Sequence, residues 1–133
     1  MLRVISIAVF SIVFLTACGT SRPIYNANSQ NSVSELSQVE MRGVIAEALN
    51  YKRWRILEES KGRIKAGIDV RRHYAEVVID YTDKGFRINY ADSKNLDYLS
   101  GRQRIHRNYN KWIQLLEGEI KVRANQLEYK KKN

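Results

Sequence analysis

The chain has 133 residues, with 23 Lys+Arg against 14 Asp+Glu, a formal net charge of +9 and a single cysteine. One cysteine excludes an internal disulfide, and the length limits the folded part to one small domain. The excess of positive charge favours anionic partners over cationic ones.

The first 17 residues have the pattern of a targeting segment. Arg3 is followed by the apolar run VISIAVFSIVFLTA at residues 4–17. This run is shorter than the roughly 20 apolar residues that a membrane-spanning helix needs. A charged start, an apolar middle and small residues at the end are typical of a secretory signal peptide. We therefore expect residues 1–17 to be removed.

The single cysteine follows directly. Leu15, Thr16, Ala17 and Cys18 resemble the lipobox of bacterial lipoproteins. This resemblance implies a diacylglycerol thioether on Cys18, cleavage before it and an added N-acyl chain, with no other cofactor. Each buried methylene contributes about 0.8 kcal/mol, so two or three chains anchor firmly. The alternatives are an ordinary secreted protein whose Cys18 lies near the cleavage site by chance, and a free, buried cysteine.

The lipobox resemblance also implies a location. An Asp after the lipidated cysteine retains many lipoproteins in the inner membrane, and here Gly19 follows Cys18. In a Gram-negative host this favours the periplasm-facing side of the outer membrane, with the inner membrane as the alternative.

The next segment has the composition of a linker. Residues 19–34, GTSRPIYNANSQNSVS, are polar, contain Pro23 and show no helical or strand period. A flexible coil of about 16 residues reaches roughly 20–25 Å. We expect residues 18–36 to be a lipidated, flexible tether and residues 37–133 to be a single periplasmic domain.

An amphipathic helix is predicted at the start of this domain. Ser37 and Glu40 match a capping box, and Asn50 can end the helix in a left-handed conformation. Apolar residues recur at helical spacing between them: Met41, Val44, Ile45, Ala48 and Leu49.

Four segments with a period of two come next. They are residues 53–56, 63–70, 74–81 and 86–91. Strict alternation of apolar and polar residues predicts an antiparallel sheet with one buried and one wet face. The connections are short, and Gly62 and Gly85 can take a positive φ in the turns. The pattern predicts a four-stranded meander.

The helical period returns near the C-terminus. Asn108 is the expected N-cap, and the apolar stripe consists of Tyr109, Trp112, Ile113, Leu116, Ile120 and Leu127. The order α-β-β-β-β-α predicts an α+β fold of two layers, with both helices packed on one face of the sheet.

Three segments together carry a family resemblance. They are GRIKAGIDVRRHYAEVVIDY at residues 62–81, INYADSKNLDY at 88–98 and IHRNYNKWIQLLEGEI at 105–120. They resemble a family of small, uncharacterised Gram-negative lipoproteins, with residues 105–112 as the most specific part. The resemblance implies a one-domain periplasmic lipoprotein and brings no activity or catalytic residue.

Two basic stretches raise the possibility of an anion site. VRRHY at 70–74 falls in a predicted hairpin turn, and IHRNYNKW at 105–112 places donors at a helix start, where free N–H groups favour an anion. If the stretches meet, five side chains could form a recess for a phosphate or carboxylate: Arg71, Arg72, His73, His106 and Arg107. In the alternative, Asn108 caps the helix, aromatic residues pack in the core and the histidines bond the loop.

No catalytic or metal site is expected. The two histidines lie far apart in sequence, without an HExxH motif or an acid cluster. Asp92 and Ser93 could be imagined as triad partners of His106, but no G-x-S-x-G elbow accompanies them, and a turn is the simpler role.

The sequence thus predicts a non-enzymatic, membrane-anchored binding module that contacts an anionic envelope component. Three alternatives remain. One is an accessory or structural subunit of an envelope assembly that pairs through an open sheet edge or face. Another is a solvated basic surface without a dedicated ligand. The third is a hydrolase, which predicts a solvent-accessible cleft with His106 close to a nucleophile and an acid. Nucleic acid is not an expected partner in the periplasm, and the oligomeric state is open.

Overall fold

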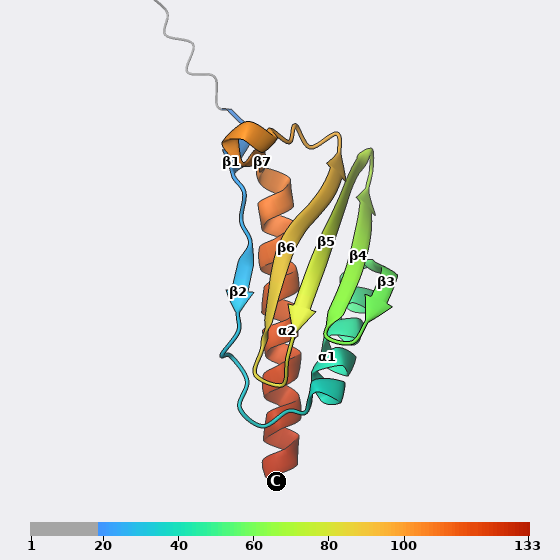
Figure 1. Cartoon of the computed structure of the whole chain (residues 1–133), viewed down its shortest axis with the longest axis vertical. Coiled ribbons are helices and arrows are strands. Elements are labelled where there is room, and N and C mark those ends of the chain that lie inside the picture. Colours follow the sequence, from blue (N-terminus) through green and yellow to red (C-terminus); the bar gives the residue numbers. More distant parts are fainter. Residues whose placement is uncertain (1–18) are drawn as a thin grey trace, which may run out of the picture.

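Within residues 19–133, the part that the computed structural model describes, the chain forms two α-helices and two antiparallel sheets (Figure 1). The elements in chain order are β1 Ser21–Pro23, β2 Ala27–Ser29, α1 Gln38–Tyr51, β3 Arg55–Ser60, β4 Arg63–Val70, β5 His73–Tyr81, β6 Phe86–Lys94, the 3₁₀ turn η1 Ser100–Arg102, β7 Arg104–His106 and α2 Arg107–Lys132. The predicted α+β class is confirmed.

The larger sheet has the strand order β2-β6-β5-β4-β3, and β1 pairs with β7 in a separate small sheet. The consecutive strands β3 to β6 form the predicted meander. The prediction of four strands is wrong by one, because β2 adds a fifth strand alongside β6. Figure 1 shows both helices on the same side of this sheet.

The alternating pattern of the meander matches its burial. β4 and β5 pair without interruption from Arg63↔Asp80 to Val70↔His73. The inward positions of these two strands are buried: Ile64, Ala66, Ile68, Ala75, Val77, Ile79 and Tyr81. A period of two therefore directs one face of the sheet into the core.

The first strand of the meander lies later than predicted. Trp54 precedes it and is buried, while all of β3 is exposed. The pairing of β3 with β4 shifts register between Ile56 and Glu58. Such a bulge puts the alternation out of step, which explains why residues 57–60 showed no strand pattern.

The first helix begins as predicted and ends later. The Ser37 hydroxyl accepts from the Glu40 N–H (3.1 Å), and the Ser37 N–H donates to the Glu40 carboxylate (2.8 Å), which completes the capping box. The helix continues through Tyr51, and Arg53 rather than Asn50 takes the left-handed conformation (φ 64°).

The second helix begins two residues before its predicted start. His106 is the N-cap, and its Nδ1 accepts from the Asn108 N–H (3.2 Å). Asn108 is therefore inside the helix. The earlier start follows from β7, which ends at His106 where it pairs with Ser21.

Residues 20–36 run along the folded domain, and the prediction of a flexible tether is wrong for this part of the chain. β1 and β2 pair with β7 and β6, and Ala27, Val33 and Leu36 are buried in the core. We call residues 20–36 the N-terminal strap. Its strands have three residues each, which is too short to reveal a period.

The predicted signal peptide and lipobox, residues 1–18, lie outside the described residues. Among residues 19–133, neither helix combines the length and apolar character needed to cross a membrane.

Candidate functional site

The two basic stretches meet in the structure. The β4–β5 turn and the start of α2 lie at the same end of the molecule (Figure 1). The rings of His73 and His106 stack there, with centroids 5.8 Å apart and planes 27° apart. The ring of Trp112 lies 6.3 Å from that of His73. The two stretches therefore do come together, as the predicted anion site requires.

Both histidines make structural hydrogen bonds. His73 Nδ1 lies 2.6 Å from the carbonyl oxygen of Asn95, and because a carbonyl only accepts, this nitrogen carries the hydrogen. The Asn95 amide in turn donates to the Arg72 carbonyl (2.8 Å). His106 Nδ1 accepts from a backbone N–H, so its hydrogen is on Nε2. His73 thus bonds the loop, as the alternative expected, while His106 rather than Asn108 caps the helix.

The arginines of these stretches point to solvent. Arg71, Arg72 and Arg107 are exposed, and within residues 19–133 no carboxylate lies at ion-pair distance from them. By contrast, Arg55 is paired with Asp69 at 2.6 Å. An unpaired guanidinium retains its donors for an external phosphate or carboxylate, which it can bind with two parallel hydrogen bonds.

The five predicted residues do not line one recess. A shallow hollow of about 410 Å³ on the open face of the sheet includes Arg71, Arg72 and His73 in its wall, whereas His106 and Arg107 lie outside it. Its wall also contains the acids Asp69, Glu76 and Asp92 and the cations Arg55 and Lys94, so an anion in this hollow would meet both charges. The hollow is therefore not a purely basic pocket, and Arg71, Arg72 and Arg107 are exposed at the end of the domain.

Tyr74 also lines that hollow and was not among the site residues that the sequence predicted. Its hydroxyl donates to the Glu76 carboxylate (2.7 Å), and this bond, with burial, raises the pKa of Tyr74 to about 12. Its ring covers Gly67, where an added Cβ would meet the hydroxyl at 2.9 Å, and Lys94 Nζ lies 5.6 Å from the ring centroid. These residues come from β4, β5 and β6, and only the pairing register of the three strands shows that they are neighbours.

The chain joins the folded domain at this same end. The Thr20 carbonyl accepts from the Arg107 N–H (2.8 Å), and the Arg104 guanidinium donates to the Ser21 hydroxyl and carbonyl (3.0 and 2.9 Å). Arg22, in β1, and Arg102, in η1, are also exposed here. We call the surface formed by Arg22, Arg71, Arg72, Arg102 and Arg107 the basic end.

One asparagine of the IHRNYNKW stretch fixes the N-terminal strap. The Asn110 amide donates to the Pro23 carbonyl (2.8 Å), and its oxygen accepts from the Tyr25 N–H (2.9 Å). His106 caps α2, Tyr109 is buried in the core and Trp112 lies against His73, whereas Arg107 and Lys111 are exposed. Asn110 therefore joins the N-terminal strap to the first turn of α2.

A buried carboxylate fixes the middle of the strap. Glu117 is 8% exposed and accepts from the hydroxyls of Tyr25 (2.6 Å) and Ser29 (2.7 Å). Burial acts to raise the pKa of Glu117, but the hydrogen bonds from Tyr25, Ser29 and Lys121 together hold this pKa below its usual range. The bond to Glu117 raises the pKa of Tyr25 to about 12. The contacts of Glu117 with Tyr25, Ser29 and Lys121 form a charge-assisted network between strap and helix.

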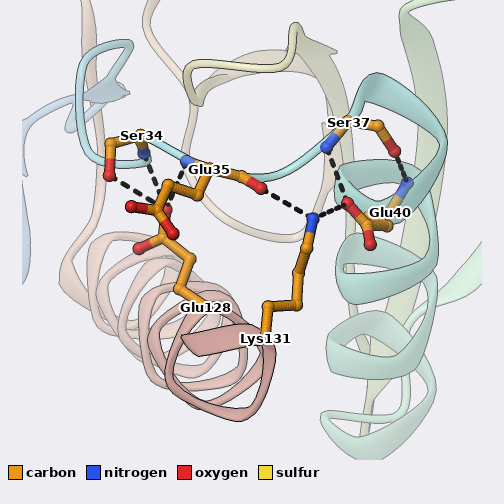
Figure 2. A network of polar contacts seen from close by, with 6 residues as sticks. All are labelled: Ser34, Glu35, Ser37, Glu40, Glu128 and Lys131. Carbon is orange, nitrogen blue, oxygen red and sulfur yellow. Dashed lines mark hydrogen bonds and ion pairs between the residues drawn. The ribbon is translucent and has the colours of Figure 1, made fainter. Parts of the chain in front are cut away.

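The far end of α2 fixes the last part of the strap (Figure 2). Glu128 accepts from the backbone N–H groups of Ser34 and Glu35 (2.7 and 2.8 Å). Lys131 donates to the Glu35 carbonyl and to Glu40 in α1, both at 2.8 Å. The strap is therefore bonded to α2 near both ends of that helix.

The residues considered for catalysis have other positions than expected. Asp92 and Ser93 lie in β6, so the predicted turn is wrong, and the Ser93 hydroxyl is bonded to the Tyr90 hydroxyl (2.8 Å). Over residues 19–133, no group of three or more His, Cys, Asp or Glu side chains is arranged to hold a metal ion.

No known protein family, characterised protein or solved structure matches this chain. The resemblance to small Gram-negative lipoproteins therefore stays a prediction, and the function is inferred from the residues and their geometry.

Proposed function

We propose that this protein is a non-enzymatic lipoprotein, anchored through acyl chains on Cys18 to the periplasmic side of the outer membrane, and that its basic end contacts an anionic component of the envelope. The observation that supports this is the gathering of exposed arginines at the end where the chain arrives from position 18. Guanidinium groups suit the phosphates of lipid headgroups and lipopolysaccharide and the carboxylates of peptidoglycan.

The anchor is tested by the intact mass of the protein purified from membranes. We expect a mature chain that begins at Cys18 and carries the added mass of a diacylglycerol and an acyl chain. A Cys18→Ser variant should keep its signal peptide and lose these additions, because serine has no thiol to form the thioether. A wild-type chain with an unmodified amino terminus would refute the anchor.

The basic end is tested with two matched triple variants of a chain that begins at residue 19. One carries Arg71→Ala, Arg72→Ala and Arg107→Ala. The control removes three exposed cations at the opposite ends of the same strands: Lys61, Lys84 and Arg87. Binding to phosphatidylglycerol vesicles and to muropeptides is measured at increasing salt.

We expect the first variant to lose about a hundred-fold in affinity for one of these probes, since each of the three cations near an anionic surface contributes about 1 kcal/mol and about 1.4 kcal/mol is ten-fold. The control variant should lose much less. Equal losses in the two variants would mean that diffuse charge, rather than the basic end, attracts the anion.

A second candidate function is supported by the outer side of α2. Leu115, Val122 and Tyr129 are exposed by 47%, 52% and 70% and follow one another at seven-residue spacing. The acids of this helix, Glu117, Glu119 and Glu128, are engaged in contacts with the strap or with Arg123, whereas Lys111 and Lys130 are exposed. This surface fits an acidic amphipathic helix, as in an accessory subunit of an envelope assembly.

A photocrosslinking residue at Val122 tests this second function in cells. We expect crosslinks to an acidic helical segment of one envelope protein. The control is the same residue at Val39, which is an exposed valine on α1. If both positions crosslink to the same set of proteins, α2 has no dedicated partner.

A further inference from the structure

We infer that the basic end is seated directly on the anionic headgroups of the bilayer that holds the anchor, so that the partner of this end is the membrane surface itself. The inference rests on the proposed lipidation of Cys18. It goes further by fixing which surface of the domain faces the bilayer and by making the arginines contacts to the protein's own membrane.

The first argument is the length of free chain. Position 18 is followed by Gly19, and the backbone of Thr20 is already bonded to the start of α2. Two residues span at most about 7 Å, because an extended chain covers roughly 3.3–3.6 Å per residue. A free tether of 16 residues would have reached roughly 20–25 Å. With so short a connection, the end of the domain that contains Thr20 must stay near the headgroups.

The second argument is that the strap is bonded to the rest of the domain along its whole length. From its first residues to its last, it is bonded to β7, Asn110, Glu117 and Glu128. The domain could move away from the bilayer only if these bonds were broken in turn. Since the bonds include charge-assisted ones to buried or partly buried groups, the folded domain does not lengthen its own connection.

The third argument is the composition of this end. Between Asn95 and Lys111, the chain contains Arg102, Arg104, Arg107 and Lys111 against a single acid, Asp97. The β4–β5 turn adds Arg71 and Arg72 without acidic partners in the described part of the chain. Leu99, 48% exposed, lies directly before η1. Arginines beside an exposed apolar side chain fit phosphate groups above an acyl region.

The seated orientation also determines what extends from the membrane. α2 starts at the basic end and has 26 residues, so it carries its C-terminal lysines about 39 Å away at 1.5 Å per residue. The β5–β6 hairpin lies toward the same distant end (Figure 1). In the competing orientation the domain would lie on the outer side of α2, with Val122 against the bilayer.

Single-cysteine reporters in the full, processed chain distinguish these orientations, because Cys18 is the only natural thiol. A donor dye is attached at Gly101→Cys in η1, at Val122→Cys on α2 or at Lys84→Cys in the β5–β6 turn, all at exposed positions. Each protein is reconstituted in vesicles of phosphatidylethanolamine and phosphatidylglycerol that carry an acceptor on the headgroups. Energy transfer is then compared among the three positions.

We expect transfer to be strongest from position 101, weaker from 122 and weakest from 84. In a Lys84→Cys protein with Arg71→Glu and Arg72→Glu, transfer should rise, because the short connection keeps only the Thr20 end near the headgroups and the domain is then free to tilt; Lys61→Glu and Arg87→Glu in the same background should leave it unchanged. Equal transfer from positions 101 and 122, or no difference between the two charge reversals, would refute the inference that the basic end rests on the headgroups.

The chain without an introduced cysteine separates the two proposals. If it accepts no thiol label, Cys18 is blocked, and a failure of the transfer pattern then refutes the seat alone. If it accepts label, the thiol is free, and the anchor fails together with the inference that depends on it.

Discussion

Replacement of Glu117 by Gln should detach the strap from α2 at its middle. The carboxylate accepts from Tyr25 and Ser29 at 2.6 and 2.7 Å and is paired with Lys121 at 2.9 Å. Gln keeps the shape but makes neutral hydrogen bonds, which contribute about 0.5–1.5 kcal/mol each instead of about 1.5–3. With two such bonds weakened, the free energy of unfolding should fall by about 2 kcal/mol.

Urea denaturation measures this change, because the midpoint shifts while the slope stays constant if both states keep their compactness. Glu119→Gln is the matched control, since Glu119 lies on the same helix and is paired with Arg123 at 2.8 Å in a more exposed setting. Such partly exposed pairs contribute about 0–1 kcal/mol. In the Glu117 variant, hydrogen exchange of the strap amides should accelerate relative to the wild type, and exchange of the α1 amides should accelerate much less.

A double-mutant cycle with Tyr25→Phe completes this test. If Tyr25 acts through Glu117, the two substitutions together should cost less than the sum of their separate effects. The reasoning fails if Glu117→Gln costs no more than Glu119→Gln, or if the cycle is additive.

Three further predictions concern the core, a helix and pH. Tyr109→Phe should stabilise the protein by about 1 kcal/mol in thermal denaturation, because the buried hydroxyl has no hydrogen-bond partner among the described residues; a loss of stability would reveal a partner. Gly118→Ala should raise stability by about 0.5–1 kcal/mol, since an added Cβ has open space inside α2, and no gain would contradict this. The pKa values of Glu40, Glu117 and Glu128 are lowered in the folded state, so their stabilising effect is complete above an unfolded pKa of about 4.3 and is lost as the pH falls through the folded values. Urea midpoints measured from neutral to acidic pH should therefore decline below this pH, and a flat profile would refute the assignment.

The elements that the sequence predicts well are those with several repeats of their period. The stripe of α1 and the alternation in β4 and β5 each extend over eight or more residues, and their buried faces agree with the pattern. β3 was predicted only over its first two residues, because its bulge breaks the alternation after Ile56. Local patterns thus predict structure only while the local period is intact.

The strap could not be predicted because its contacts are distant in sequence. Its polar residues have the composition of a linker, but Tyr25 and Ser29 are bonded to Glu117, 92 and 88 positions away. No local signal separates a polar residue that meets water from one that meets a buried carboxylate. The bonds that convert a linker into part of the domain appear only in three dimensions.

The candidate site was predicted in part. The sequence suggested that the stretches around His73 and His106 could meet, and their rings do stack. It did not reveal that the β5–β6 bulge between Glu76 and Val77 brings acids into the hollow next to Arg71 and Arg72. Which cations share a surface with which acids depends on strand register, and alternation alone leaves that register open.

The strap also determines when the domain can close during synthesis. The Ser34 N–H can bond only when Glu128, 94 positions later, has been synthesised, and the Thr20 carbonyl only when the start of α2 has been. A chain that crosses a membrane from its N-terminus presents the strap long before these partners emerge. If Cys18 is processed as we propose, the enzymes that cleave and acylate it would therefore meet an unfolded strap whenever they act before the last turns of α2 have emerged.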